Sequence, residues 1–307
     1  MKNANQSPSA VVMIRPHHFI ANPETAADNV FQQTSPDVSA EYIKAEAGKE
    51  VQKTIEIFRS HGVTVHAFDD FTKDTPDSVF PNNWFTTHAD GTIGIFPMYC
   101  ESRRKEKNPE IIKLLSKEYQ VNKVIDYSML EEQHLFLEGT GSMVLDHSNR
   151  YAYAVISNRM SERVLNQFCQ DFDYQPVPFT ATDDNNVAVY HTNVLMSMAT
   201  DFVLIGLDCV KNLVERTSLI ERFQQSDKEI IALTYEQICN FAGNALELST
   251  PNGNILAMST TAYTSLTESQ VLMIENHVKI VPIDVPTIEL AGGSIRCMLA
   301  GIHLPKK

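Results

Sequence analysis

Apolar and polar residues alternate in four pairs of short segments, and each pair surrounds a turn signal, a pattern typical of β-hairpins. The predicted strands lie at residues 84–88 and 92–96, 142–146 and 151–156, 193–198 and 202–205, and 245–249 and 254–258. Their first strands start at 84, 142, 193 and 245, which gives steps of 58, 51 and 52 residues. Such regular spacing indicates an internal repeat.

A fifth unit is expected to combine the two ends of the chain. One further step from residue 245 falls near the strand-like run 295–304, and its expected partner is the apolar run 10–15. Helical periodicity separates the hairpins, and short strands such as 63–66 and 280–283 follow the helices. The predicted helices cover residues 39–61, 108–119, 161–171, 213–225 and 268–278.

These patterns predict an α/β fold made of five ββαβ units. Closed end to end, the units form a pseudo-fivefold α/β propeller, with the helices outside and the strand ends around a central active-site cavity. We therefore expect one domain over residues 1–307, with a polar, disordered tail at residues 1–9. The alternative is an ordinary α/β sheet in which the spacing arises by chance.

Composition narrows the classes of function. The chain has 25 Lys and Arg against 38 Asp and Glu, a net charge of −13, which disfavours nucleic-acid and anionic-membrane partners. It shows no apolar signal-peptide core and no membrane-length apolar run. The five cysteines, without a C-x-x-C pair, indicate reduced thiols, a cytoplasmic location and no zinc site. We expect Trp84 and every cysteine except Cys297 to lie in the core.

Polar residues gather at the start of each unit's first strand, and equivalent positions of a ring converge on one opening. The set comprises Asp77, Asn82 and Asn83 in unit one, Glu138 in unit two, His191 and Asn193 in unit three, and Gly292, Gly293 and Cys297 in unit five. A thiol, an imidazole and a carboxylate that meet there would form a nucleophile, a base and an orienting acid. Taken singly, Cys297 could be an inert core thiol and His191 a core histidine, but buried glutamate is rare unless paired.

Short motifs in matching order resemble the guanidine-modifying, or amidinotransferase, superfamily, which has the pentein fold and includes arginine deiminases and dimethylargininases. The segments 14–19 (IRPHHF) and 80–85 (FPNNWF) are similar to bacterial citrulline-utilisation hydrolases. The segments 76–80 (PDSVF), 102–106 (SRRKE), 137–139 (LEG) and 157–159 (SNR) resemble dimethylargininase motifs. Cys297 stands where these families keep their nucleophile.

The resemblance implies a role for each matching residue. Cys297 would be the nucleophile, His191 the general acid and base, and Glu138 the acid that holds the substrate nitrogens. Arg103 and Arg159 would bind the substrate α-carboxylate, unless they are solvated charges at helix starts, and Asp77 would hold the polar end. No metal or organic cofactor is implied.

The chain departs from these relatives at two positions. Deiminases and dimethylargininases have an aspartate where Asn83 falls, and arginine deiminases read H-x-D where this chain has His191-Thr192-Asn193. Some relatives that act on N-acylated arginine also use asparagine. Because an amide offers both an acceptor and a donor, we expect it to suit a neutral ureido group as well as or better than a guanidinium.

The predicted activity is hydrolysis of a C–N bond in the side chain of an arginine-derived, citrulline-like amino acid through a covalent cysteine intermediate. A His191 imidazolium is expected to favour the Cys297 thiolate. Amidinotransfer, guanidine hydrolysis of the dimethylargininase or arginine deiminase type, and a non-catalytic binding module remain alternatives. A papain-like protease is disfavoured because its cysteine precedes its histidine. The expected partner is a small molecule, with a homodimer as a further possibility.

Overall fold

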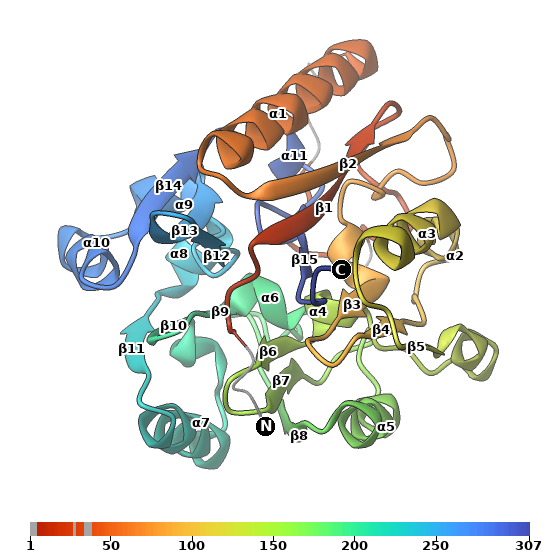
Figure 1. Cartoon of the computed structure of the whole chain (residues 1–307). Helices are drawn as coiled ribbons and strands as arrows, with labels where there is room; N and C mark the ends of the chain where they lie inside the picture. Colours follow the sequence, from red (N-terminus) through yellow and green to blue (C-terminus); the bar gives the residue numbers. More distant parts are fainter. Residues whose placement is uncertain (1–4, 27–28, 34–38) are drawn as a thin grey trace.

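The structure is a computed structural model that describes residues 5–26, 29–33 and 39–307. Its strands form five three-stranded sheets within this part of the chain. In each sheet the central strand pairs antiparallel with one neighbour and parallel with the other. Figure 1 shows the sheets around a common centre and the longer helices at the periphery. The model therefore has five similar units, as the repeat predicts.

Four sheets are built from consecutive strands. They comprise β3 (Phe85–Thr87), β4 (Thr92–Ile95) and β5 (Lys123–Asp126); β6 (Val144–Asp146), β7 (Tyr151–Val155) and β8 (Gln175–Phe179); β9 (Met196–Met198), β10 (Phe202–Ile205) and β11 (Glu229–Ala232); and β12 (Leu246–Thr250), β13 (Gly253–Ser259) and β14 (Lys279–Ile283).

The fifth sheet joins segments from both ends of the described chain. β1 (Ala10–Pro16) pairs antiparallel with β15 (Ala300–Ile302) and parallel with β2 (Thr64–Asp70). This pairing is the one expected between the N-terminal and C-terminal apolar runs. Residues 1–4 of the expected tail lie outside the described residues. Gln6 and Ser7 are buried, and Gln6 donates hydrogen bonds to the backbone of Leu145 and Met198, so an ordered segment starts before residue 9.

The predicted helices all form, with ends within three residues of those expected. They are α1 (Ala40–Ser60), α3 (Pro109–Glu118), α5 (Glu162–Phe172), α7 (Leu213–Gln225) and α10 (Glu268–Glu275). Local signals fix their starts: the Ser39 and Asn108 side chains accept backbone N–H groups of the first turns of α1 and α3. Each of these helices buries at least one apolar side chain. Among the described residues no helix is long and apolar enough to cross a membrane.

Short helices complete the fold. They are η1 (Pro81–Asn83), α2 (Glu101–Arg104), η2 (Ser128–Gln133), α4 (Gly139–Ser142), α6 (Thr192–Leu195), η3 (Leu207–Cys209), α8 (Tyr235–Cys239), α9 (Thr260–Ser265) and α11 (Pro286–Glu289). Two of them correct the predicted strands, because α4 and α6 are single helical turns that include the predicted strand starts at 142 and 193. Most of the expected strand 295–304 is likewise a turn, and only Ala300–Ile302 pairs as β15.

Most of the residues that we expected in the core are buried. Trp84 is buried, its ring 4.4 Å from that of Phe85, and the five cysteines form no disulfide. Cys239 is an exception: it ends α8 on the solvent side and is exposed.

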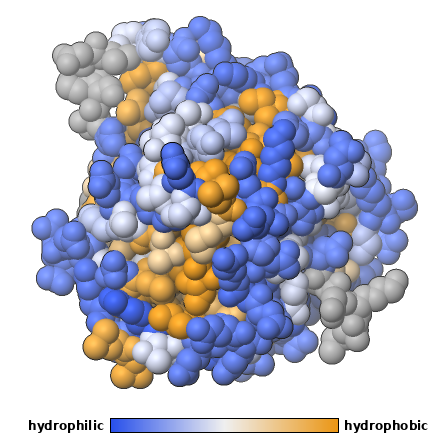
Figure 2. Space-filling view, turned by 90° about the vertical axis from the view of Figure 1, so that its left-hand side faces the viewer, coloured by the Kyte–Doolittle hydropathy of each residue, from blue (hydrophilic) through white to orange (hydrophobic). Residues whose placement is uncertain are grey.

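Figure 2 shows the side of the molecule that carries α7 and α10, where an apolar strip crosses a mostly hydrophilic surface.

Candidate active site

Single helical turns at the starts of the units hold the predicted site residues. Glu138 precedes α4, His191 precedes α6, and Asn83 ends η1. Cys297 lies in a similar turn, in which its N–H and that of Met298 bond to the Ser294 carbonyl. The site residues therefore lie in the segments that precede the strands and not in the strands themselves.

Glycine is required where these turns approach each other. Gly139 has φ +43°, and a Cβ on it would lie 2.7 Å from the Asn82 and Asn83 carbonyl oxygens. A Cβ on Gly141 would overlap the Asn83 side chain and lie 2.8 Å from the His191 ring. Only glycine therefore allows α4 to lie against both η1 and His191.

A small cavity, with an empty volume of about 260 Å³, collects most of the predicted residues. Its lining includes Asp77, Asn83, Arg103, Arg159, His191, Gly293 and Cys297, together with Thr25, Asn29, Phe80, Tyr190 and Ala291. Glu138 lies directly behind His191: its Oε2 is 2.7 Å from Nε2 of the imidazole, and neither residue is exposed. The thiol, the imidazole and the carboxylate thus converge as the repeat predicts.

Opposite charges keep Glu138 ionised. Burial alone would raise its pKa, but the Arg159 guanidinium at 3.5 Å, the His191 hydrogen bond and Arg103 hold that pKa well below its usual range. Burial has the opposite effect on the imidazole, because it lowers the pKa of His191 to about 4 despite Glu138. His191 is therefore a neutral base that an ionised carboxylate orients.

The surroundings of the thiol differ from the expected thiolate–imidazolium pair. Among the described residues, Cys297 Sγ receives its side-chain hydrogen bonds from two amides, Asn193 Nδ2 at 3.3 Å and Asn244 Nδ2 at 3.2 Å. Asn244 Oδ1 also accepts the N–H groups of Ser294 and Cys297. Asn244 is absent from the residues predicted from the sequence, although it lies 51 residues after Asn193, about the step that separates units three and four.

The two arginines occupy a network of buried acids. Arg103 donates from Nε and Nη2 to Glu106, and it lies 3.8 Å from Asp77 and 3.9 Å from Glu138. These acids raise the pKa of Arg103 although burial opposes them. Arg159 pairs with Glu138, and its guanidinium lies 4.7 Å from the centre of the Tyr190 ring. Both arginines reach the cavity with carboxylates already beside them, rather than as solvated charges.

Three predicted binding residues are turned toward protein groups. In the amide orientation that satisfies both of its polar atoms, the Asn83 oxygen accepts from Arg103 at 2.7 and 3.0 Å. Asn82 bonds to Thr140 and does not line the cavity. Gly292 likewise lies outside the lining; it has φ +76°, and its carbonyl accepts the Tyr190 hydroxyl.

Two of the predicted site residues carry a buried acceptor oxygen with no hydrogen-bond partner among the described residues: Asp77 Oδ1 and Asn193 Oδ1. The other oxygen of Asp77 accepts from Asn22 at 2.8 Å, and burial raises the pKa of Asp77. Since buried polar atoms are rarely left unpaired, both oxygens are candidates to receive N–H groups of a ligand. Among the described residues, no cluster of histidine, cysteine or acidic side chains could hold a metal ion.

The fold and the family match define a member of the amidinotransferase superfamily, a hydrolase that acts on C–N bonds other than peptide bonds. The family model for eukaryotic N,N-dimethylarginine dimethylhydrolase matches residues 15–304, so the chain belongs to this family. The resemblance expected from the short motifs is thereby confirmed. No curated protein matches the sequence.

Several solved structures share the fold at low sequence identity. One is the N-terminal domain of ArgZ, an arginine dihydrolase from the ornithine-ammonia cycle in cyanobacteria, which was solved as a cysteine-to-serine variant bound to substrate. The comparison gives a TM-score of 0.75 and 16% sequence identity, and it covers 96% of this chain and 98% of the ArgZ domain. AgrE with ornithine and NAD⁺ has the same TM-score and identity, over 97% of this chain and 40% of that one. A dimethylarginine dimethylaminohydrolase adduct has a TM-score of 0.65 and 14% identity, over 96% and 100%.

Proposed function

We propose that the protein is a cysteine-dependent hydrolase that cleaves a C–N bond in the side chain of an arginine-derived amino acid, with Cys297 as the nucleophile and His191 as the general acid and base. Glu138 orients His191. The observation that carries the proposal is that Cys297 and His191, from two different units, line one buried cavity, while Glu138, from a third unit, contacts the imidazole from behind. A cysteine-to-alanine variant of AgrE was solved with L-arginine, which supports an amino acid of this class.

We further propose a neutral, citrulline-like ureido group as the part of the substrate that reacts. Glu138 and Asp77 already face the guanidinium groups of Arg103 and Arg159, so little negative charge remains for a cationic substrate. A third acid, Glu106, already accepts two hydrogen bonds from Arg103. The unpartnered Asn193 oxygen, beside the thiol, would accept an N–H of the ureido group, and Asp77 would accept from the ammonium end.

The chemistry balances with these residues alone. The Cys297 sulfur adds to the ureido carbon as the neutral His191 takes the thiol proton. The imidazolium returns this proton to a departing nitrogen, and a thiocarbamate remains on sulfur. Water, deprotonated by His191, then displaces the sulfur to give a carbamate, which decomposes, so that the products are ornithine, ammonia and carbon dioxide.

A guanidino substrate is the second candidate. The family to which the chain belongs is that of a dimethylarginine hydrolase, and AgrE binds L-arginine, so arginine or a methylated arginine is the alternative. An amidinotransferase would differ by using an amine instead of water in the second step. A non-catalytic module would leave all of these substrates unchanged.

We also propose a closed architecture. Residues 1–307 would form one domain in which the five units close into a pseudo-fivefold pentein propeller, and the pairing of β1 with β15 supports this closure. Homodimer formation and a cytoplasmic location remain predictions.

One experiment tests the proposed reaction. The full-length protein is incubated with citrulline, arginine and N,N-dimethylarginine, and ornithine, ammonia and citrulline are quantified. Cys297→Ala should lose about 10³-fold or more in kcat. Cys169→Ala is the matched control, because this buried thiol, whose pKa burial raises to about 12, lies on α5 away from the cavity. Full activity of Cys297→Ala would refute the covalent mechanism.

A further inference from the structure

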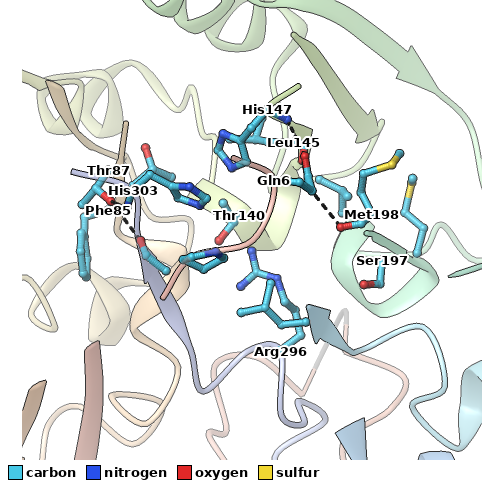
Figure 3. Close-up of a pocket in the computed structure, with 16 residues that line it drawn as sticks. Gln6, Phe85, Thr87, Thr140, Leu145, His147, Ser197, Met198, Arg296 and His303 are labelled. Atoms are coloured by element: carbon cyan, nitrogen blue, oxygen red, sulfur yellow. Dashed lines mark hydrogen bonds between the residues drawn. The ribbon is translucent and has the colours of Figure 1, made fainter. Parts of the chain in front are cut away.

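A second cavity shares the catalytic turns but not the catalytic side chains. Its empty volume is about 590 Å³, and its lining includes Gln6, Thr140, His147, Ser197, Arg296 and His303. Arg296 lines this cavity, whereas the next residue, Cys297, lines the active-site cavity. Figure 3 shows the Arg296 side chain reaching into the cavity, with the imidazoles of His147 and His303 on one side.

The charge of this cavity is opposite to that of the whole chain. Its lining contains one cation, Arg296, and no aspartate or glutamate among the described residues. The net charge of the protein is −13, so a cavity free of acids is unlike the rest of the molecule. A larger neighbouring cavity shares Pro8, His147 and His303 with it. Arg150 and Lys306 line that cavity together with Asp90 and Asp173, so the excess of positive charge is confined to the cavity of Arg296.

The Arg296 guanidinium has no countercharge. Within the described part of the chain it forms no ion pair, and its one side-chain hydrogen bond runs from Nη1 to the Leu299 carbonyl at 2.9 Å. Burial lowers the pKa of Arg296 to about 10, so the group stays charged at neutral pH. Arg103 and Arg159, in contrast, lie beside carboxylates. A partly buried cation without a partner is unfavourable unless an anion accompanies it.

The neutral polar groups around Arg296 are engaged elsewhere. Thr140 donates to the Asn82 carbonyl, and Ser197 donates to the Ala245 carbonyl. Gln6 uses its amide nitrogen on two carbonyls, and its oxygen accepts the N–H of His147. These groups therefore shape the cavity but leave the guanidinium donors of Arg296 available to a ligand.

We propose that this cavity is a binding site for a small oxyanion, a carboxylate or a phosphate, with Arg296 as its principal ligand. The planar guanidinium presents paired N–H donors that match two oxygens of either group. The site is independent of the proposed hydrolysis, because none of its lining residues belongs to the catalytic set. An anion bound to Arg296 would nevertheless lie beside the turn that carries the thiol, because Arg296 precedes Cys297 in this turn. The Arg296 N–H donates to the Asn244 carbonyl, and the Asn244 side chain donates to Cys297 Sγ.

Calorimetric titration of the full-length protein tests the site. Inorganic phosphate and acetate are the two probes, and the tighter of them identifies the class of oxyanion. We expect one anion per protein molecule in the wild type and in the control Arg163→Gln, which removes an equal charge from the exposed face of α5. Arg296→Gln should weaken binding about tenfold or more.

The proposal is overturned if neither probe binds the wild type at millimolar concentration, or if Arg296→Gln binds as tightly as the wild type. Circular dichroism checks that the variant folds. Should it not fold, Arg296→Lys keeps the charge but loses the forked donors. Weaker binding by the lysine variant supports the site, whereas unchanged affinity for both anions refutes it.

Discussion

Nε2 of His191 lies 2.7 Å from Oε2 of Glu138, in a place where both side chains are shielded from solvent. The second Glu138 oxygen accepts the Tyr99 N–H at 2.9 Å, so the carboxylate is fixed from both sides. Because the carboxylate can only accept, the contact between His191 and Glu138 places the proton of the neutral imidazole on Nε2. Nδ1 is therefore the basic nitrogen of His191.

Replacing this carboxylate by an amide tests its role as the residue that orients His191. Glu138→Gln should lower kcat about 10²–10⁴-fold, because the imidazole loses its fixed orientation and the charge that stabilises its protonated form. It also leaves Arg159 with less countercharge, so the free energy of unfolding should fall by about 3 kcal/mol. Steady-state kinetics and urea denaturation measure the two effects.

Glu247→Gln separates the catalytic effect from the loss of a buried charge. Glu247 is buried, accepts hydrogen bonds from Ser7 and Thr200, and does not line the active-site cavity. This variant should lose stability and keep kcat. An equal loss of kcat in both variants would mean that Glu138 acts only through folding.

Asn244 is expected to support the thiol. Asn244→Ala removes an N–H donor 3.2 Å from Cys297 Sγ, and since a hydrogen bond to the charged form favours it, alkylation of Cys297 by iodoacetamide at pH 7 should slow about tenfold. Mass spectrometry of the labelled peptide follows the rate. Asn240→Ala is the control, because this exposed amide bonds only to Glu236 among the described residues. An unchanged alkylation rate in Asn244→Ala would exclude this role.

The choice between ureido and guanidino substrates should depend on Asn193 more than on Asn83. The Asn193 oxygen has no partner, whereas the Asn83 oxygen accepts from Arg103. We expect the wild type to favour citrulline over arginine in kcat/KM. Asn193→Asp should shift that ratio toward arginine about tenfold or more, because a carboxylate then faces the cation, and Asn83→Asp should add little. A wild type that hydrolyses arginine and ignores citrulline contradicts the ureido substrate.

Acid should destabilise the fold through its buried histidines. Burial, together with His303, His88 and nearby arginines, lowers the pKa of His147 well below its usual value. The unfolded protein binds a proton near pH 6.5, whereas the folded protein does so only at lower pH. The free energy of unfolding is therefore highest above pH 6.5 and falls as the pH drops below it, by at most about 1.4 kcal/mol per pH unit for each such histidine.

Urea denaturation between pH 7.5 and 4.5 measures this slope. His147→Asn should make it shallower, and the same substitution at the exposed His134 should leave it unchanged. Equal slopes in the wild type and His147→Asn would show that His147 does not contribute to acid unfolding.

Periodicity in the sequence predicts most of this architecture. Helix positions such as Glu162–Phe172 follow directly from one apolar face. The repeat brings His191 and Cys297 to one cavity, with Glu138 directly behind the imidazole. The predicted strand starts at 142 and 193 are wrong because a strand and a single helical turn of small or apolar residues have the same local composition.

Other features of the site depend on contacts that no local pattern contains. Arg103 and Glu106 belong to one motif, but the other acidic partners of Arg103, Asp77 and Glu138, come from two other segments. The directions of the Arg296 and Cys297 side chains, into different cavities, follow from the turn that begins at Ser294. Asn244 could have been predicted from the sequence, because its position follows from the repeat.

The pairing of β1 with β15 has a consequence for biosynthesis. Four of the sheets consist of strands that leave the ribosome in succession, so each can form while translation continues. One edge of β1 (Ala10–Pro16) stays unpaired until residues 300–302 have been synthesised. The turn that contains Cys297 immediately precedes these residues. A nascent polypeptide therefore exposes an unpaired strand edge, open to aggregation or chaperone binding, until Cys297 and the residues that follow it have been synthesised. Completion of the last sheet and assembly of the active site are the same event, so a prematurely terminated product has neither.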